Sequence, residues 1–335
     1  MQWRTERIIF SQLFQSSMVS VHVPSLTFSN GYKMPVIGLG TWKSKPGDVQ
    51  RAVVDAIDAG YRHLDCAYMY GNESEVGEGV KLKVQEGVVQ REDLFITSKL
   101  WNTFHRPDLV VSACKKSLSL LGLEYVDLYL MHWPFAFKED GDLIPTDADG
   151  NIVLSDVDYL ATWREMETCV HLGLTHSIGL SNFNSQQIER LLVSAEVKPA
   201  NLQIECNPYL TQKKLINFCQ SRGIEVTAYS PMGSPDSPYL KAGMPRLLED
   251  PGLHQVAHRV GKSVGQVVLR YLVQQGISAV PKSVTKSRIQ ENINIFDFEL
   301  SDADTSYIDS FNQNLRICHR DHARGHKFYP FNVEF

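Results

Sequence analysis

The chain has 335 residues, 43% of them hydrophobic and 21% charged, so it can bury a large core as one barrel or as two ordinary domains. Its net charge of -5 argues against general binding to nucleic acid or anionic membranes, so any basic site must be local. The six cysteines show no CxxC or CxxH spacing, which is typical of reduced thiols in a cytoplasmic protein and not of a disulfide framework or zinc site. No apolar run approaches the ~18 residues of a membrane-spanning helix.

The first residues of the chain allow two interpretations. Arg4 and Arg7 precede a short apolar run at residues 8–10, which is too short for a secretory signal. The segment is either a weak mitochondrial presequence or a longer start, such as an alternative exon, ahead of Met18. In both cases we expect residues 1–20 to form a poorly ordered N-terminal extension.

A β-hairpin is expected directly after this extension. Residues 26–28 and 33–35 are the expected strands, and Asn30-Gly31 between them is a typical hairpin turn. Gly38 and Gly40 follow, but a dinucleotide-binding loop would need a third glycine and an opening helix, and neither is present. In a barrel strand, glycine more simply marks a close approach of backbone or ligand.

From Val36 onward, short apolar strands alternate with amphipathic helices. Asp48 is expected to cap the first helix, whose apolar stripe has i, i+3, i+4 and i+7 spacing and stops before Gly60. The strands are expected at residues 36–40, 61–65, 95–99, 126–132, 177–181, 202–206, 225–230 and 277–282. Further helices are expected at residues 75–85, 108–121, 159–172, 186–193, 211–221 and 263–275, and residues 135–158 read as a polar insertion.

Eight such units predict an α/β fold of the (β/α)8 TIM-barrel type, in a single domain over residues 21–335. A doubly wound sheet is the alternative, and it would need a glycine-rich first turn that the sequence lacks. In a TIM barrel the chemistry takes place at the carboxyl ends of the strands.

Four ionisable residues are expected to meet at that end of the barrel. Asp65, Lys99 and His132 each lie at the end of an expected strand, and Tyr70 follows the first of these strands in a polar loop. Taken singly, each has a plain structural interpretation as a turn cap, a rim charge or a packed side chain. Their convergence on one face is much harder to explain by packing.

The chemistry of these four groups predicts a general acid. A phenol has an ordinary pKa of ~10, and a nearby ammonium lowers it by stabilising the phenolate. Asp65 would keep Lys99 charged, and His132 would orient a substrate oxygen beside Tyr70. The set contains no nucleophile–base pair for acyl transfer, and no cluster has metal-ligand spacing. A carbonyl protonated by tyrosine needs a hydride from elsewhere, so a nicotinamide cofactor is implied.

From about Leu26 to Phe335, the sequence resembles the aldo-keto reductase superfamily, close to its aldose and aldehyde reductase branch. The motifs are GLGTWKS (38–44), GYRHLDCAYMYGNE (60–73), SKLW (98–101), DLYLMHWP (127–134), GLSNFN (179–184), QIECNPYLTQ (203–212), AYSPMGSPD (228–236) and PKSVTKSRIQEN (281–292). The resemblance implies a monomeric barrel that reduces small-molecule carbonyl compounds with NADPH. It also allows an insect-type member that reduces ecdysteroid ketones.

The resemblance also implies a role for each matching residue. Tyr70 is then the proton donor, Asp65 and Lys99 tune it, and His132 orients the carbonyl group. The implied cofactor-binding residues are Gly40, Thr41, Trp42, Ser181, Asn182, Gln203, Tyr229, Ser230, Met232, Ser234, Asp236, Lys282, Ser283, Thr285, Arg288, Glu291 and Asn292. Lys282 and Arg288 lie near an expected helix start and suit a phosphate dianion, which favours NADPH over NADH. The alternative is that both are ordinary surface charges.

The substrate pocket is expected to be aromatic and apolar, with a C-terminal substrate loop at residues 315–329 closing its far side. Its expected residues are Trp42, Trp101, His132, Trp133, Phe137, Tyr239, Leu315 and Cys318. Leu315 and Tyr239 stand where the aldose reductase branch usually has tryptophan. The smaller side chains should widen the pocket for bulky or hydrophobic carbonyls, including ketosteroids, and make glucose an unsuitable substrate.

Two other functions stay open. One is an NADPH-binding regulatory module with incidental turnover, of the kind seen in channel-associated relatives. The other is a Schiff-base aldolase that uses Lys99, against which the neighbouring Asp65 argues because a paired lysine stays protonated and non-nucleophilic.

Overall fold

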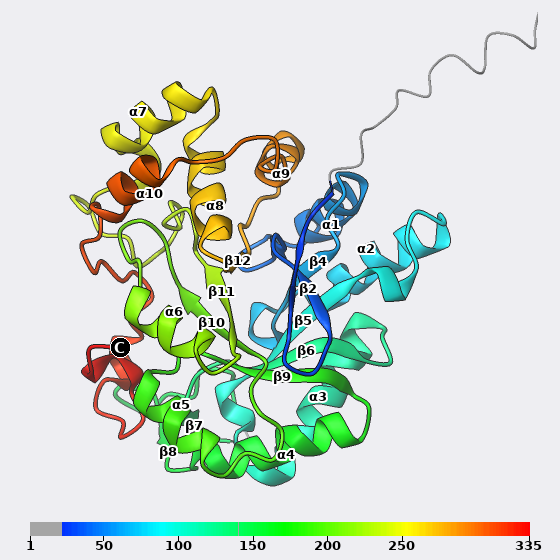
Figure 1. Cartoon of the computed structure of the whole chain (residues 1–335). Helices are drawn as coiled ribbons and strands as arrows, with labels where there is room; N and C mark the ends of the chain where they lie inside the picture. Colours follow the sequence, from blue (N-terminus) through cyan, green and yellow to red (C-terminus); the bar gives the residue numbers. More distant parts are fainter. Residues whose placement is uncertain (1–21, 140) are drawn as a thin grey trace, which may run out of the picture.

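Eight parallel strands form the centre of the molecule in the computed structural model, which describes residues 22–139 and 141–335 (Figure 1). The expected extension at residues 1–20 lies outside the described residues. Neighbouring strands follow the order β12-β11-β10-β9-β6-β5-β4-β3. They are β3 (Leu39–Gly40), β4 (His63–Asp65), β5 (Phe95–Leu100), β6 (Val126–Met131), β9 (Thr175–Ser181), β10 (Asn201–Glu205), β11 (Glu225–Tyr229) and β12 (Ser278–Ala279).

Backbone contacts between the first and last strands close this sheet into a barrel. Parallel bridges join Ile37 to Ala279 and Gly40 to Lys282. At this seam a Cβ atom on Gly40 would lie 2.8 Å from the carbonyl oxygen of Val280, so only glycine lets the two backbones approach. The predicted (β/α)8 TIM barrel is therefore confirmed, and Gly40 marks a close backbone approach as expected.

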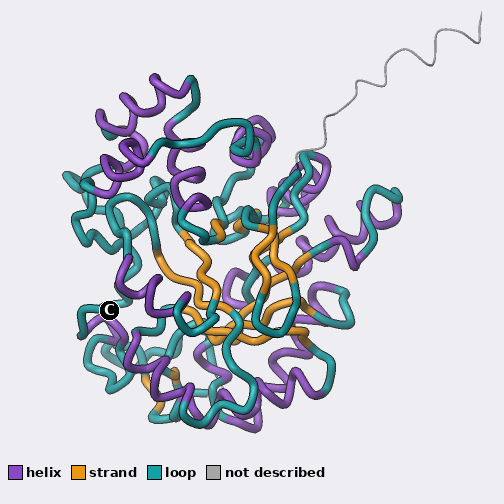
Figure 2. Tube along the Cα trace, in the orientation of Figure 1, coloured by secondary structure: helices purple, strands orange, loops and turns teal. Residues whose placement is uncertain are grey.

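Helices surround the barrel, as the purple and orange tubes in Figure 2 show. They are α1 (Asp48–Asp58), α2 (Glu73–Gln85), α3 (Pro107–Leu121), α4 (Tyr159–His171), α5 (Ser185–Leu192), α6 (Lys213–Gln220), α7 (Pro251–Val260), α8 (Val264–Gln274), α9 (Lys286–Ile293) and α10 (Asp302–Asp309). No helix was expected at α7 or α10, which are additional to the regular alternation, whereas α9 follows the last strand at the helix start expected near Lys282 and Arg288. None of the described helices is long and apolar enough to cross a membrane.

The start of α1 differs from the prediction. The cap is Gly47 in the left-handed conformation, and no side chain caps the helix. Asp48 is the first helical residue, and its carboxylate accepts a hydrogen bond from Arg51 at 2.6 Å. Glu75 accepts the Gly47 N–H at 2.8 Å, so a carboxylate from α2 satisfies this N–H group.

Two small hairpins lie outside the barrel wall. The expected N-terminal hairpin is present as β1 (Ser25–Thr27) and β2 (Lys33–Pro35). The second, β7 (Ala136–Phe137) paired with β8 (Leu154–Ser155), lies within the stretch predicted as a polar insertion. Its strands are too short to give a periodic signal in the sequence.

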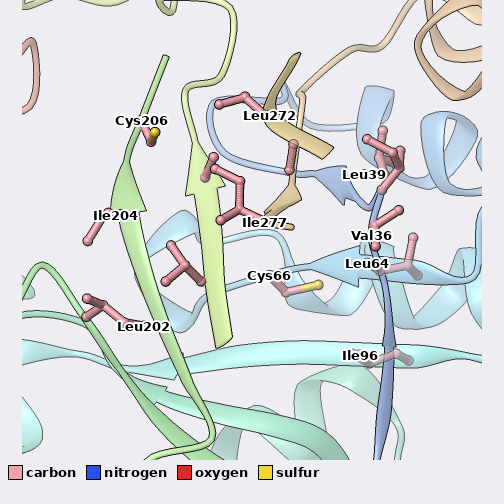
Figure 3. Packing of buried hydrophobic residues seen from close by; sticks show 14 of the residues in the cluster. Val36, Leu39, Leu64, Cys66, Ile96, Leu202, Ile204, Cys206, Leu272 and Ile277 are labelled. Carbon is pink, nitrogen blue, oxygen red and sulfur yellow. The ribbon is translucent and has the colours of Figure 1, made fainter. Parts of the chain in front are cut away.

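Apolar side chains fill the space between strands and helices, and Figure 3 shows part of this core, with Leu64, Ile96 and Leu202 among its labelled side chains. A separate hydrophobic cluster closes one end of the barrel. In it, Phe28 of the hairpin packs edge-to-face on Phe95, with ring centroids 5.9 Å apart. Because the hairpin seals this amino-terminal end, the opposite end remains for a binding site.

Candidate active site

A buried lysine connects the residues at the carboxyl end of the barrel. The Lys99 ammonium donates to both Asp65 carboxylate oxygens, at 2.9 and 2.8 Å, and to the Cys66 carbonyl oxygen at 2.9 Å. Its remaining contact is the Tyr70 hydroxyl at 3.1 Å. Asp65 ends β4 and Lys99 lies near the end of β5, so the parallel register brings the two side chains together.

The pKa of Tyr70 differs from the sequence-based expectation. Burial raises the pKa of the phenol to about 12, although Lys99 acts to lower it. The expected effect of Lys99 is therefore present, but burial of the phenol outweighs it. At neutral pH Tyr70 is protonated and able to donate, and a phenolate formed there would have the ammonium beside it.

Lys99 itself remains charged. Burial alone would lower the pKa of this ammonium, but Asp65 and Tyr70 raise it, and the net direction is upward. The side chain is fully buried, so an uncharged partner in place of Asp65 would leave a costly isolated charge.

His132, which directly follows β6, places an uncharged imidazole ring beside Tyr70. Its ring meets the Tyr70 ring edge-to-face with centroids 5.9 Å apart. Burial lowers the pKa of this imidazole well below its ordinary value, and the Lys99 and Arg320 cations lower it further. The ring is therefore neutral at physiological pH and holds one proton.

Two amide side chains link this group to neighbouring strands. Gln203 in β10 donates to Asp65 Oδ1 at 2.7 Å. Asn182, which follows β9, donates to the His132 carbonyl oxygen at 3.0 Å and accepts from the Tyr229 hydroxyl at 2.7 Å. The Gln203 carbonyl oxygen also accepts the Asn182 N–H at 3.0 Å, so the ends of six strands share one hydrogen-bonded network.

A cleft of about 1030 Å³ opens above this network. Its lining includes Asp65, Tyr70, His132 and all but one of the expected cofactor-binding residues, the exception being the buried Thr41. Of the expected pocket residues, Trp42, His132, Trp133, Tyr239 and Cys318 line the cleft.

Three expected pocket residues do not line the cleft. Trp101 is fully buried, donates to the Leu143 carbonyl oxygen at 2.6 Å and packs edge-to-face on buried Phe137. Leu315 is half-buried and packs against the main core. The structure thus gives Trp101 and Phe137 the place of a second layer, which supports the residues that face the cleft.

The part of the cleft lined by Lys282 and Arg288 carries two positively charged side chains. Neither of them forms an ion pair with any of the described residues. Thr285, between them in the chain, is the N-cap of α9 and makes no side-chain cap. Two free cations beside an uncapped helix start form a suitable site for a phosphate group.

One lining residue that the sequence analysis did not single out is Arg320. Its guanidinium lies 5.7 Å from the ring centroids of both Trp101 and Trp133, and its backbone is left-handed, with φ of 54°. Arg320 lies in the charged stretch HRDHARGH at residues 319–326, and only the fold decides which of these side chains faces the cleft. Among the described residues, no group of three or more His, Cys, Asp or Glu side chains is arranged to hold a metal ion.

The chain is similar to known proteins over most of its length. Residues 36–313 match the model of the aldo/keto reductase family. The zebrafish (Danio rerio) aldo-keto reductase family 1 member A1-A is 51% identical over 88% of this chain and 91% of its own length. The human (Homo sapiens) aldo-keto reductase family 1 member A1 is 49% identical over 90% and 96%. Among solved structures, the aldose reductase from Schistosoma japonicum superposes with a TM-score of 0.88 at 47% identity, covering 93% of this chain and 99% of that one.

Proposed function

Because the chain belongs to the aldo/keto reductase family, we propose that it reduces aldehydes and ketones to alcohols with NADPH, and that Tyr70 is the proton donor. The family makes it a nicotinamide-dependent oxidoreductase that acts on carbonyl compounds. The observation that carries the finer proposal is the Lys99 ammonium, held between the Asp65 carboxylate and the Tyr70 hydroxyl.

This arrangement supports acid catalysis by Tyr70. A bound reduced nicotinamide would supply the hydride that reaches the carbonyl carbon. The Tyr70 hydroxyl then gives its proton to the carbonyl oxygen, and the resulting phenolate lies 3.1 Å from Lys99 Nζ. The ammonium is in position before the reaction, so the developing charge is stabilised without rearrangement of the protein.

His132 would orient the carbonyl group. Its neutral ring has one N–H to donate, and Nδ1 is buried without a hydrogen-bond partner among the described residues. The proton is therefore best placed on Nε2, the remaining ring nitrogen, which can donate to a substrate oxygen. Such a bond would hold that oxygen next to the Tyr70 hydroxyl.

The lining of the cleft supports a nicotinamide dinucleotide. The Ser181 hydroxyl and Gln203 Oε1 have hydrogen-bonding capacity that no described residue uses, and both can bind a carboxamide. At the other end, Lys282 and Arg288 suit the 2′-phosphate that distinguishes NADPH from NADH. The residues present therefore fit this cofactor.

The substrate end favours bulky aromatic or hydrophobic carbonyls. Trp42, Trp133 and Tyr239 supply an apolar lining, and the cleft is large enough for a dinucleotide together with a sizeable substrate, ketosteroids included. Arg320 adds a cation at this end, with no ion pair to another described residue. We therefore propose that a carbonyl compound carrying a carboxylate binds better than its neutral analogue.

The buried ion pair disfavours Schiff-base chemistry. A lysine must lose its proton to attack a carbonyl carbon, whereas Asp65 and Tyr70 raise the pKa of Lys99. Its three N–H groups are also directed to Asp65, Cys66 and Tyr70. This geometry favours a lysine that stabilises charge over one that forms a covalent intermediate.

The test is NADPH oxidation with an aromatic aldehyde, an aliphatic aldehyde, an aldose and a ketosteroid, comparing the parent with Tyr70→Phe. Tyr68→Phe is the matched control, because Tyr68 lies in the same short helix and packs on Phe104. We expect Tyr70→Phe alone to abolish turnover while NADPH binding, followed by fluorescence, stays unchanged. Tight NADPH binding by a parent that reduces none of the four would contradict the proposal and favour a regulatory module.

A further inference from the structure

The C-terminal substrate loop is attached to the end of β10 by a series of hydrogen bonds. Residues 312–318 lie beside residues 205–212, which begin with the last residue of this strand. The Tyr209 carbonyl oxygen accepts the Leu315 N–H at 3.0 Å, and Gln212 Oε1 accepts from the Arg316 guanidinium at 3.3 Å. Gln212 in turn donates to the Glu205 carbonyl oxygen at 2.7 Å.

The Glu205 carboxylate makes the last contact in this series. One of its oxygens accepts the Ile317 N–H and the other accepts the Cys318 N–H, both at 2.8 Å. The residue is fully buried. Two consecutive backbone N–H groups are thus held by a single side chain, which fixes both the position and the direction of the loop at this point.

A carboxylate is a costly group to bury here. Burial raises the pKa of Glu205, while the two backbone N–H groups and the nearby Arg316 cation act in the opposite direction. Packing alone would be served by an apolar side chain without this cost. The carboxylate therefore serves to hold the loop backbone in place through these two N–H groups.

The backbone held by Glu205 leads directly to the substrate end of the cleft. Cys318 lines the cleft, and Arg320 follows two residues later with its guanidinium over Trp101 and Trp133. The left-handed backbone of Arg320 is unfavourable for a residue that has a Cβ atom, so its neighbours must hold it in place. On the other side, the Tyr329 hydroxyl donates to the His319 carbonyl oxygen at 2.7 Å.

We propose that Glu205 is a positioning residue for substrate recognition, which sets the place of Arg320 and Cys318 through the backbone of Ile317 and Cys318. This inference rests on the proposed carbonyl reductase function. Glu205 does not contact the Asp65–Lys99–Tyr70 group in any described hydrogen bond, so it acts on substrate binding and not on proton transfer.

Glu205→Gln tests this role because it keeps the size of the side chain but turns one acceptor into a donor that faces a backbone N–H. We expect KM for 4-carboxybenzaldehyde to rise about tenfold, the scale of one charge-assisted hydrogen bond. The kcat for this aldehyde, kcat/KM for propanal and the NADPH dissociation constant should change less than about twofold.

Glu167→Gln is the matched control. Glu167 is also buried and also accepts two consecutive backbone N–H groups, from Glu196 and Val197 at 2.8 and 3.0 Å, but it lies on α4 and does not line the cleft. Oε1 of Glu167 accepts both N–H groups, and a glutamine can keep both bonds, so the ratio of kcat/KM for 4-carboxybenzaldehyde to that for propanal should not change. Glu205→Asp keeps the charge with a shorter reach, so we expect an intermediate KM, and this variant keeps the test available if Glu205→Gln does not fold.

A double-mutant cycle tests whether Glu205 acts through Arg320. In an Arg320→Ala background, the effect of Glu205→Gln on KM for 4-carboxybenzaldehyde should disappear. A tenfold rise in KM for 4-carboxybenzaldehyde in that background would overturn the proposal. So would an equal loss of kcat/KM for both aldehydes in Glu205→Gln, or the same selective loss for 4-carboxybenzaldehyde in Glu167→Gln.

Hydrogen exchange separates this inference from the proposed function. Amide exchange at Ile317 and Cys318 should be faster in Glu205→Gln than in the parent, while exchange in the barrel strands stays the same. If the parent reduces no carbonyl compound, the proposed function fails, and this measurement still decides whether Glu205 holds the loop. Unchanged exchange at both amides would overturn the role of Glu205 even in an active reductase.

Discussion

Removal of the Asp65 charge is the most direct perturbation of the proposed acid. In the parent, the Asp65 carboxylate accepts from Lys99 at 2.8 and 2.9 Å. Asp65→Asn keeps the size of the side chain but places an uncharged amide beside Lys99. Breaking a buried ion pair from one side costs about 3–5 kcal/mol, so the variant should be less stable. Burial would then act on Lys99 without the opposing carboxylate, and the pKa of Lys99 should fall from its raised value.

The effect on rate follows from the 3.1 Å separation of Lys99 Nζ and the Tyr70 oxygen. At an effective dielectric constant of about 20, a full charge pair at that distance is worth about 5 kcal/mol. With about half of the charge developed in the transition state, the loss of the ammonium removes about 2.7 kcal/mol, or about two powers of ten in kcat/KM. The loss is largest above the lowered pKa of Lys99, so activity should recover in part as the pH falls.

The assay is kcat/KM for one aldehyde across pH, together with thermal unfolding. Asp127→Asn is the control, because Asp127 pairs with Arg91 at 2.7 Å at the opposite end of the barrel and should affect stability without affecting the rate. An Asp65→Asn enzyme with the parent's rate and pH profile would refute the assigned role of the Asp65–Lys99 pair.

Two further predictions concern the cofactor site and the barrel seam. Lys282→Ala should weaken NADPH binding about tenfold to a hundredfold, the range for one charged hydrogen bond, and leave NADH binding nearly unchanged. Fluorescence titration measures both constants, and an equal loss for the two cofactors would argue against a 2′-phosphate contact. Gly40→Ala should lower stability by about 1–3 kcal/mol, since its methyl group would lie 2.8 Å from the Val280 carbonyl oxygen. Thermal unfolding should show no such loss in Gly141→Ala, which meets no atom within 4 Å.

Local patterns in the sequence were sufficient to predict the frame of the molecule. Apolar strands and amphipathic helices alternate with distinct periods, so the barrel and its eight strands could be predicted before the structure was known. The positions of Asp65, Lys99 and His132 followed from the same pattern, because parallel strands end on one face. The prediction that Asp48 caps α1 was wrong, since Gly47 is the N-cap and its N–H is bound by Glu75 from a neighbouring helix.

Only the tertiary structure decided the properties that depend on contacts between distant segments. The net direction of the Tyr70 pKa depends on how deeply the phenol is buried, and burial prevails over the nearby Lys99. Arg320 is one of several charged residues in its loop, and its place over Trp101 and Trp133 requires the folded loop. Glu205 holds N–H groups more than a hundred residues away in the chain. Periodicity describes which face of an element is buried, whereas these contacts depend on which elements meet.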